Sequence, residues 1–267
     1  MMPYTNINGI DIYYEMHGQG EPLLLLSGAG GDLTYWQPIS IKLSQHNKVI
    51  LFDFRDAGRS EQSDHPYHID ILAQETKQFL DTLSIKKVHV LGHSMGGMVA
   101  QQLAYQFPEL IDKLILYSTT TKMRTIGKLA VTAMTELKQQ EKNFELLVKT
   151  FSMWSYSNDY LSQENMMGNI IQAAKNQLYP QTAQGYEKQI KATCDFDSTP
   201  WVSTIKANTL ILAGADDLLT PLSDATFIKN AITNSQLKII KNVAHCGHLE
   251  KTKPFVKILI EFLHPQL

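Results

Sequence analysis

The sequence predicts an α/β fold, in which helices cover a mainly parallel β-sheet and one helical insertion interrupts the chain. Short apolar segments with strand character alternate with segments of helical spacing, as in a parallel sheet with crossover helices. Several strand-like segments are continuous apolar runs, as expected of strands buried on both faces. Between residues 122 and 199 no such run is present, and Met, Gln, Lys and aromatic residues predominate. We expect residues 1–121 and 200–267 to form the core and 122–199 a helical cap.

Apolar spacing locates the individual elements. Residues 10–18 alternate with a period of two and predict a half-buried strand, whereas 22–28 form a continuous run typical of a central strand. The other expected strands are residues 48–54, 86–92, 112–118, 208–216 and 236–243. Helical spacing is found at residues 35–45, 70–83, 98–107, 128–140, 142–154 and 253–263. Pro108 is expected to end the third of these helices, because proline cannot continue one.

Composition and charge limit the classes of function. The chain has 267 residues, 43% of them hydrophobic, which suits one domain carrying an insertion. The net charge of −2 favours neither nucleic acid nor an anionic membrane as a partner. No apolar run approaches the roughly 18 residues of a membrane span, and no secretory signal is visible. Cys194 and Cys246 could pair but do not indicate a disulfide scaffold. We expect a soluble, cytoplasmic protein with a small-molecule substrate, and homodimerisation stays open.

Residues 90–101, VLGHSMGGMVAQ, place Ser94 in a glycine cluster between a buried strand and a helix. The pattern G-x-S-x-G in this context predicts a nucleophile elbow, a sharp turn that presents the serine hydroxyl. Gly92 and Gly96 lack side chains where the strand and helix backbones must approach closely. The following helix points free N–H groups at the site, which favours a developing oxyanion. The alternative is a glycine-rich turn in which the serine is incidental.

The segment GHSMGGMVAQ resembles the elbow of the α/β-hydrolase family, in the subgroup of small serine esterases and enol-lactonases with a helical cap. The resemblance covers nearly the whole chain outside the insertion, and it implies a mainly parallel sheet of eight strands. It also implies a Ser-Asp-His triad, with the acid after a later strand and the histidine near the C-terminus. His93, within the elbow, is expected to pack behind the serine.

Residues 210–221, LILAGADDLLTP, resemble the family pattern G-x-x-D-x-x-x-P. The pattern maps onto Gly214, Asp217 and Pro221 and makes Asp217 the triad acid. Asp216 is the rival, and both aspartates could instead cap a helix before Pro221. Some family members carry the acid after the preceding core strand, where this chain reads YSTTT and has no carboxylate.

Two histidines compete for the role of base in residues 241–255, KNVAHCGHLEKTKPF. In the family the catalytic histidine precedes a glutamate by five residues and a phenylalanine of the last helix by ten. His245 satisfies both spacings, with Glu250 and Phe255. His248 lacks the glutamate, and we expect it to be a structural or pocket-rim residue, although the glycine before it imitates a family dipeptide.

These three residue types complete a proton relay. A serine hydroxyl is a poor nucleophile until a base takes its proton, and histidine, with a reference pKa of about 6.5, can accept that proton and return it. A buried aspartate orients the imidazole and stabilises the imidazolium that forms. The chain order Ser94, Asp217, His245 is the order of this fold.

Residues 23–36 follow an early buried strand and occupy the position of the family's oxyanion loop. The resemblance assigns the backbone N–H groups of Ala29 and Met95 as the oxyanion donors. Ser27 replaces the usual histidine of this loop, so the supporting hydrogen bonds must differ. A phosphate-binding loop is the alternative, but the G-K-[ST] ending is missing.

Residues 53–60, DFRDAGRS, resemble the family pattern D-x-R-G-x-G-x-S, with Asp56 in place of the first glycine. Asp53, Arg55 and Arg59 are expected to brace the loop rather than to act in catalysis. Asp56 is expected to form a turn by folding onto the backbone.

Methionines and aromatic residues are frequent in the expected cap. Most are expected to pack the cap against the core, and some to line an adaptable apolar pocket for an acyl group. Few cations lie near the predicted site in the sequence, which disfavours strongly anionic substrates. The candidates are Met123, Met134, Phe144, Phe151, Met153, Trp154, Tyr156, Tyr160, Met166 and Met167.

The sequence therefore predicts a serine hydrolase that cleaves a carboxylic ester or lactone of a small, largely apolar substrate through an acyl-enzyme. No metal or organic cofactor is expected. The same triad could serve carbon–carbon bond hydrolysis or a perhydrolase reaction, whereas Ser94 excludes an aspartate nucleophile. From a different class, a ligand-binding or sensory protein on a hydrolase scaffold remains the alternative.

Overall fold

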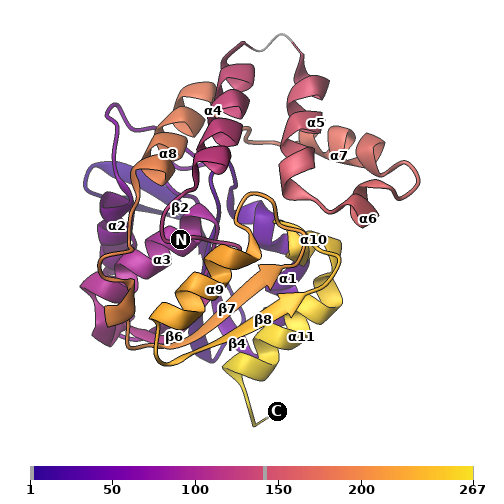
Figure 1. Cartoon of the computed structure of the whole chain (residues 1–267). Coiled ribbons are helices and arrows are strands. Elements are labelled where there is room, and N and C mark those ends of the chain that lie inside the picture. The colour runs from indigo at the N-terminus through magenta and orange to yellow at the C-terminus, as the bar shows by residue number, and fades with distance from the viewer. Residues whose placement is uncertain (1–2, 141–142, 267) are drawn as a thin grey trace.

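A mainly parallel sheet of eight strands forms the centre of the protein (Figure 1). The structure is a computed structural model that describes residues 3–140 and 143–266. The strand order is β1-β2-β4-β3-β5-β6-β7-β8, in which β2 pairs antiparallel with both β1 and β4 and the remaining pairs are parallel. The strands are β1 (Tyr4–Ile7), β2 (Ile10–His17), β3 (Glu21–Leu26), β4 (Asn47–Phe52), β5 (Val88–His93), β6 (Ile111–Tyr117), β7 (Asn208–Gly214) and β8 (Ser235–Ile240). The predicted fold class is confirmed.

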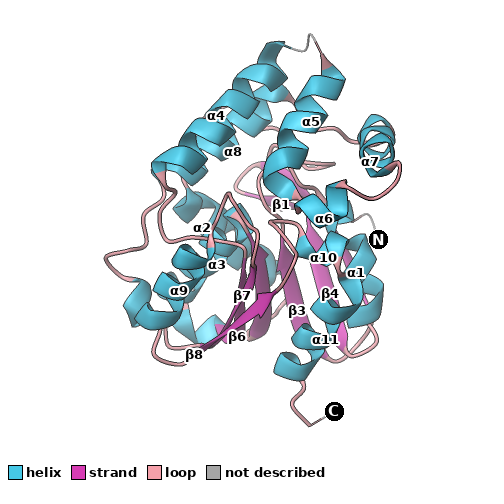
Figure 2. Ribbon diagram, turned by 45° about the vertical axis from the view of Figure 1, so that its right-hand side comes forward, coloured by secondary structure: helices cyan, strands magenta, loops and turns pink. Residues whose placement is uncertain are grey.

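Helices cover both faces of the sheet (Figure 2). Three helices, α2 (Ile69–Thr82), α3 (Met95–Gln106) and α9 (Leu222–Ala231), cover one face, and α1 (Gln37–Leu43) and α11 (Thr252–Leu263) cover the other. Each face has its own cluster of buried apolar side chains, and the central strands contribute to both. Helix α3 ends at Gln106, just before Pro108, as predicted. Short helical turns lie at Leu33–Trp36, Pro108–Leu110, Val202–Thr204 and Gly247–Glu250, the last being α10.

Between β6 and β7 the chain forms a helical insertion, α4 to α8, above the carboxyl ends of the strands (Figures 1 and 2). Its helices are α4 (Thr125–Gln140), α5 (Phe144–Ser155), α6 (Asn158–Leu161), α7 (Met166–Lys175) and α8 (Ala183–Asp195). The first residue of the helix expected at 142–154 lies outside the described residues. Lys122 and Asp197 form a β-bridge at the base of the insertion, and the Lys122 ammonium lies 2.7 Å from the Asp197 carboxylate.

Within the described chain, no helix is long and apolar enough to cross a membrane. Cys194 and Cys246 are both free thiols, so the disulfide that their number would allow does not form.

Candidate active site

Ser94 lies at the sharp turn between β5 and α3. Its φ of +53° belongs to a backbone region that is strained for serine. A Cβ atom on Gly96 would lie 2.2 Å from the Leu26 carbonyl oxygen, and one on Gly92 would lie 2.3 Å from the Gly96 carbonyl oxygen. Glycine is therefore required at both positions for α3 to pack closely on β3 and β5. The turn has the geometry expected of a nucleophile elbow.

The carboxyl ends of β7 and β8 bring Asp217 and His245 into direct contact. Asp217 Oδ2 lies 2.8 Å from His245 Nδ1, and both side chains are buried. The Asp217 carboxylate also accepts hydrogen bonds from the Leu219 and Thr220 N–H groups and from the Thr220 hydroxyl, at 2.8–2.9 Å. Asp216, the rival, is exposed, and its side chain makes no hydrogen bond within the described residues. Neither aspartate is the N-cap of α9, which is Pro221.

Two opposing effects set the charge of the Asp217 carboxyl group. Burial by itself raises its pKa, because the charged form loses contact with water. The facing His245 ring and the hydrogen bonds from Thr220 outweigh burial, and they hold the pKa of Asp217 below its ordinary value. The group is therefore a carboxylate near neutral pH. It can orient the imidazole and stabilise a positive charge on it.

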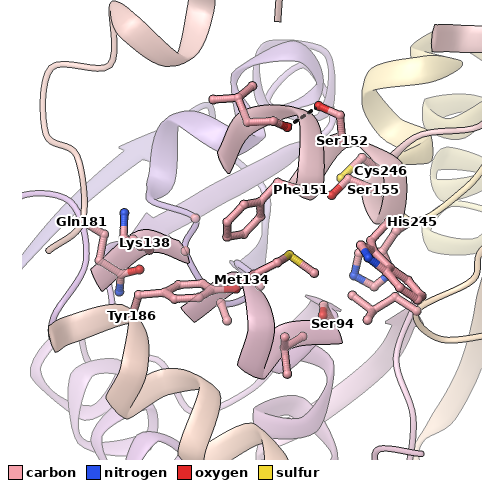
Figure 3. A pocket seen from close by; sticks show the side chains of 18 of the residues that line it. Ser94, Met134, Lys138, Phe151, Ser152, Ser155, Gln181, Tyr186, His245 and Cys246 are labelled. Carbon is pink, nitrogen blue, oxygen red and sulfur yellow. Dashed lines mark hydrogen bonds between the residues drawn. The ribbon is translucent and has the colours of Figure 1, made fainter. Parts of the chain in front are cut away.

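Ser94 and His245 line the same cavity (Figure 3). No hydrogen bond to the Ser94 hydroxyl is formed within residues 3–140 and 143–266. Hydrogen bonds between a catalytic nucleophile and its base commonly tighten only when substrate is bound. The structure thus joins Asp217 to His245 directly and places Ser94 beside them.

The backbone of His245 is held from behind by two side chains. Its carbonyl oxygen accepts hydrogen bonds from the Tyr117 hydroxyl, at 2.8 Å, and from His93 Nε2, at 3.0 Å. Because a carbonyl oxygen can only accept, Nε2 is the donor, and Nδ1 of His93 lies 3.0 Å from the Tyr35 hydroxyl. Burial, followed by the neighbouring histidines, lowers the pKa of His93 well below its ordinary value.

Sequence reasoning placed His93 behind the nucleophile but missed the two tyrosines. The position of Tyr117 in the sequence could have suggested its role. Tyr117 is the last residue of β6, and β6 pairs with β5, the strand that Ser94 follows. Tyr35 has no comparable signal, because its hydroxyl meets His93 only after the chain has folded.

His248, the rival base, is fully buried in α10 and does not line the cavity. Its Nε2 lies 3.2 Å from the Tyr35 carbonyl oxygen and its Nδ1 lies 3.4 Å from the Tyr117 hydroxyl. No contact with Asp217 is formed in the described part of the chain. Burial lowers the pKa of His248 to about 3. These contacts favour a structural role.

The low pKa of His248 predicts acid sensitivity of the fold. The unfolded chain takes up a proton here below a pH of about 6.5, whereas the folded protein does so only near pH 3. The unfolded state binds more protons between these values, so the free energy of unfolding falls as the pH drops from 6.5 towards 3. We expect His248→Gln to reduce this slope by up to about 1.4 kcal/mol per pH unit in denaturant titrations. The same substitution at His68, which is exposed, is the matched control.

The loop after β3 runs directly beside the elbow. A Cβ atom on Gly28 would lie 2.9 Å from His93 Nδ1 and 3.1 Å from the Ser94 Cβ atom, so a larger residue would displace the His93 ring. The Ser27 hydroxyl donates to the Asp32 carbonyl oxygen at 3.3 Å. This hydrogen bond supports the loop at the position where the family pattern has a histidine. The N–H groups of Ala29 and Met95 meet no acceptor among the described residues. Both donors are therefore available to a ligand.

Residues 53–60 brace the neighbouring loop. Asp53 accepts hydrogen bonds from the Leu33 N–H at 2.6 Å and the Arg59 N–H at 2.8 Å, and burial raises its pKa to about 6. Arg55 is buried and pairs with Glu75 of α2. None of these residues lines the cavity, as expected of bracing charges.

Asp56 replaces a glycine of the family pattern and retains glycine-like backbone geometry. Its φ is +63°, in the left-handed region that aspartate tolerates better than most residues. Its backbone lies in a turn closed by the hydrogen bond from the Ala57 N–H to the Phe54 carbonyl oxygen at 3.1 Å. Its side chain does not fold onto the adjacent backbone as expected but accepts from the Ser63 N–H, seven residues on, at 3.0 Å. Lys188 of α8 also lies 3.0 Å from this carboxylate, so the loop contacts the insertion.

The cavity has a volume of about 350 Å³. Ser94 and His245 lie at one end, and Lys138 and Gln181 lie at the other (Figure 3). Apolar side chains of the insertion form most of the wall between them, among them Met134, Phe151 and Tyr186. Lys138 was not anticipated, because the sequence suggested few cations near the site. It lies on the same face of α4 as Met134, four residues earlier.

The ten candidate pocket residues divide into three groups. Six line the cavity: Met123, Met134, Phe144, Phe151, Trp154 and Tyr156. Tyr160 and Met166 line an adjoining groove of about 770 Å³, which shares Gly30, Gly31, Tyr35 and Tyr156 with the cavity. Met153 is 59% exposed, and Met167 lines neither space.

The fold, the elbow and the buried Asp–His pair define the class of protein. A profile described as "alpha/beta hydrolase fold" matches residues 21–252, and the chain belongs to this family. One curated relative is the putative carbamate hydrolase RutD of Stutzerimonas stutzeri, 26% identical over 260 residues that cover 96% of this chain and 97% of the relative. Another is 3-oxoadipate enol-lactonase 2 of Acinetobacter baylyi, 27% identical over 248 residues, 92% of this chain and 90% of the relative.

Solved structures share the fold over almost the whole chain. The enol-lactonase from Burkholderia xenovorans has a TM-score of 0.86 and 24% identity, and covers 98% of this chain and 99% of its own. An esterase from Exiguobacterium antarcticum has a TM-score of 0.86 and 22% identity, with the same coverage. At these identities the likeness shows the fold alone.

Proposed function

We propose that the protein is a serine hydrolase that cleaves a carboxylic ester or lactone through an acyl-enzyme. The observation that carries the proposal is the 2.8 Å contact between Asp217 and His245 beside the cavity that Ser94 lines. The names of the relatives are consistent with this chemistry, because esters, lactones and carbamates all react at a carbonyl carbon. They also add carbamates to the substrates worth testing.

In the proposed mechanism His245 Nε2 takes the Ser94 proton while Oγ attacks the substrate carbonyl. The oxygen becomes an oxyanion and accepts hydrogen bonds from the Ala29 and Met95 N–H groups, each worth about 3 kcal/mol of barrier. His245 then returns the proton to the leaving group, and water repeats the sequence on the acyl-enzyme. Asp217 keeps the imidazole oriented throughout.

The spaces around Ser94 suggest which part of the substrate lies where. We place the acyl group in the 350 Å³ cavity, under residues 122–199 as a substrate-selecting cap, because the cavity walls are largely apolar. The adjoining groove then receives the leaving group, because it meets the cavity at Gly30 and Gly31 of the oxyanion loop. That the protein is cytoplasmic and that it forms a homodimer are still predictions. Light scattering would measure the oligomeric state.

Filling the cavity tests the placement of the acyl group. Met134 is buried in α4 and lines the cavity, so Met134→Phe removes space that a long acyl chain needs. We expect kcat/KM for hexanoate and octanoate p-nitrophenyl esters to fall about tenfold relative to acetate, the scale of one or two methylene groups. The matched control is Met153→Phe, on the exposed face of α5, which should leave the chain-length profile unchanged. An equal loss on all chain lengths would place the acyl group elsewhere.

The activity itself is tested with a fluorophosphonate probe and a panel of esters, lactones, carbamates and amides. We expect covalent labelling together with turnover of at least one ester or lactone. Folded protein that neither labels nor turns over would favour the ligand-binding alternative. Carbon–carbon bond hydrolysis and perhydrolysis could use the same triad. Separate assays for these two reactions distinguish them from ester or lactone hydrolysis.

A further inference from the structure

Hydrogen bonds fasten the loop that carries His245 to the helical insertion. The two segments are residues 242–250, which follow β8, and residues 155–159, which run from the end of α5 into the start of α6. The Cys246 N–H donates to the Ser155 carbonyl oxygen at 2.9 Å, one residue beyond His245. The insertion is thus bonded to the backbone next to the proposed base.

Glu250 forms the central link between the segments. Its Oε1 accepts from the Ala244 N–H at 2.9 Å, one residue before His245. Its Oε2 accepts from the Ser157 N–H at 3.2 Å and from the Ser157 hydroxyl. The same hydroxyl caps α6 by accepting from the Tyr160 N–H at 3.2 Å. One carboxylate therefore joins the backbone beside His245 to the start of α6.

The position of this link allows it to set the pose of His245 without touching substrate. Glu250 does not line the cavity. The His245 ring is fixed by Asp217 and its carbonyl oxygen by Tyr117 and His93, so Glu250 secures the remaining side of the residue. A displacement of about 1 Å in a reacting group can cost on the order of a hundredfold in rate.

We propose that Glu250 is a positioning residue, which holds the His245 loop against Ser157 of the insertion and so sets the geometry in which His245 takes the Ser94 proton. This role rests on the proposed function. It makes the insertion part of the base assembly as well as the wall of the cavity. The spacing of five residues between His245 and Glu250 follows from the link, because α10 turns the chain back so that Glu250 reaches Ala244.

Glu250→Gln tests the link with little change in size. A carboxamide has one acceptor oxygen, so its NH₂ group must face a donor at either Ala244 or Ser157. We expect kcat to fall about 10- to 100-fold, with KM within twofold of wild type, and fluorophosphonate labelling to slow in parallel. Ser157→Ala keeps one N–H contact and should give a smaller loss in the same direction. The double variant should lose little more than Glu250→Gln alone, because both changes break one link.

The control is Asp159→Ala, which removes an exposed contact of 2.8 Å with Asn242 between the same two segments and keeps Asn242, whose φ is +54°, in place. It leaves the Ala244–Glu250–Ser157 link intact, and we expect unchanged kcat. Lower thermal stability of Glu250→Gln and Ser157→Ala with unchanged kcat would overturn the proposal, since the link would then be only structural. A loss through KM alone would also overturn it. Wild-type protein that neither labels nor turns over would instead refute the proposed function, and this role with it.

Discussion

Ser94→Ala is expected to reduce ester turnover by at least about 10⁴-fold and to abolish fluorophosphonate labelling. Alanine removes the side-chain nucleophile that forms the acyl-enzyme in the proposed mechanism, while the elbow backbone and the oxyanion donors remain. The rate above water that survives should come from those donors and from substrate binding. The measurement is kcat/KM for a p-nitrophenyl ester, together with mass spectrometry of probe-treated protein.

A matched control is Ser155→Ala, because Ser155 also lines the cavity but lies on α5 of the insertion. It should retain labelling and most of its turnover. If Ser94→Ala remained active while Ser155→Ala lost activity, the elbow would not carry the nucleophile.

His245→Ala is the second substitution with a very large expected effect. Loss of the imidazole removes both proton transfers, so kcat should fall about 10⁴- to 10⁶-fold with the fold intact. The oxyanion donors and Ser94 remain, and slow background acylation should still be measurable.

His248→Gln serves as the comparison, since His248 is the histidine that sequence spacing could confuse with the base. It should keep most of the kcat of wild type when measured well below its own unfolding temperature, because its ring is enclosed by Tyr35 and Tyr117 away from the cavity. The reverse pattern, an active His245→Ala and an inactive His248→Gln, would show that the base was assigned to the wrong histidine.

The sequence predicted the strands that are buried on both faces. Segments such as Leu23–Leu26 and Leu114–Tyr117 are continuous apolar runs, because neither side of the central sheet meets water. The eighth strand, β1, was not located from its own residues, since only Ile7 among its four residues is buried. Helix α9 was also missed, because it buries only Ala225 and Ile228 of its ten residues and so lacks a clear apolar stripe.

In the candidate site, too, some features have a clear sequence pattern and others do not. Ser94 and Asp217 follow the buried strands β5 and β7, and His245 follows the edge strand β8. Each lies in a short recognisable pattern, so their meeting at one end of the sheet could be anticipated. The hydrogen bonds that support the His245 carbonyl oxygen have no local pattern, because Tyr117 and His93 reach it from 128 and 152 residues away in the chain. The contact of Glu250 with Ser157 spans 93 residues and has no local pattern either. Long-range polar contacts of this kind exist only once the chain is folded.

A crystal structure of the phosphonylated protein shows whether Ser94, His245 and Asp217 act as one relay around a carbonyl carbon. We expect phosphorus bonded to Ser94 Oγ and a phosphonyl oxygen 2.7–3.1 Å from the Ala29 and Met95 N–H groups. We also expect His245 Nε2 within hydrogen-bonding distance of the adduct, with Nδ1 still on Asp217. Phosphorus on any other residue, or a His245 ring turned away from both Ser94 and Asp217, would contradict it.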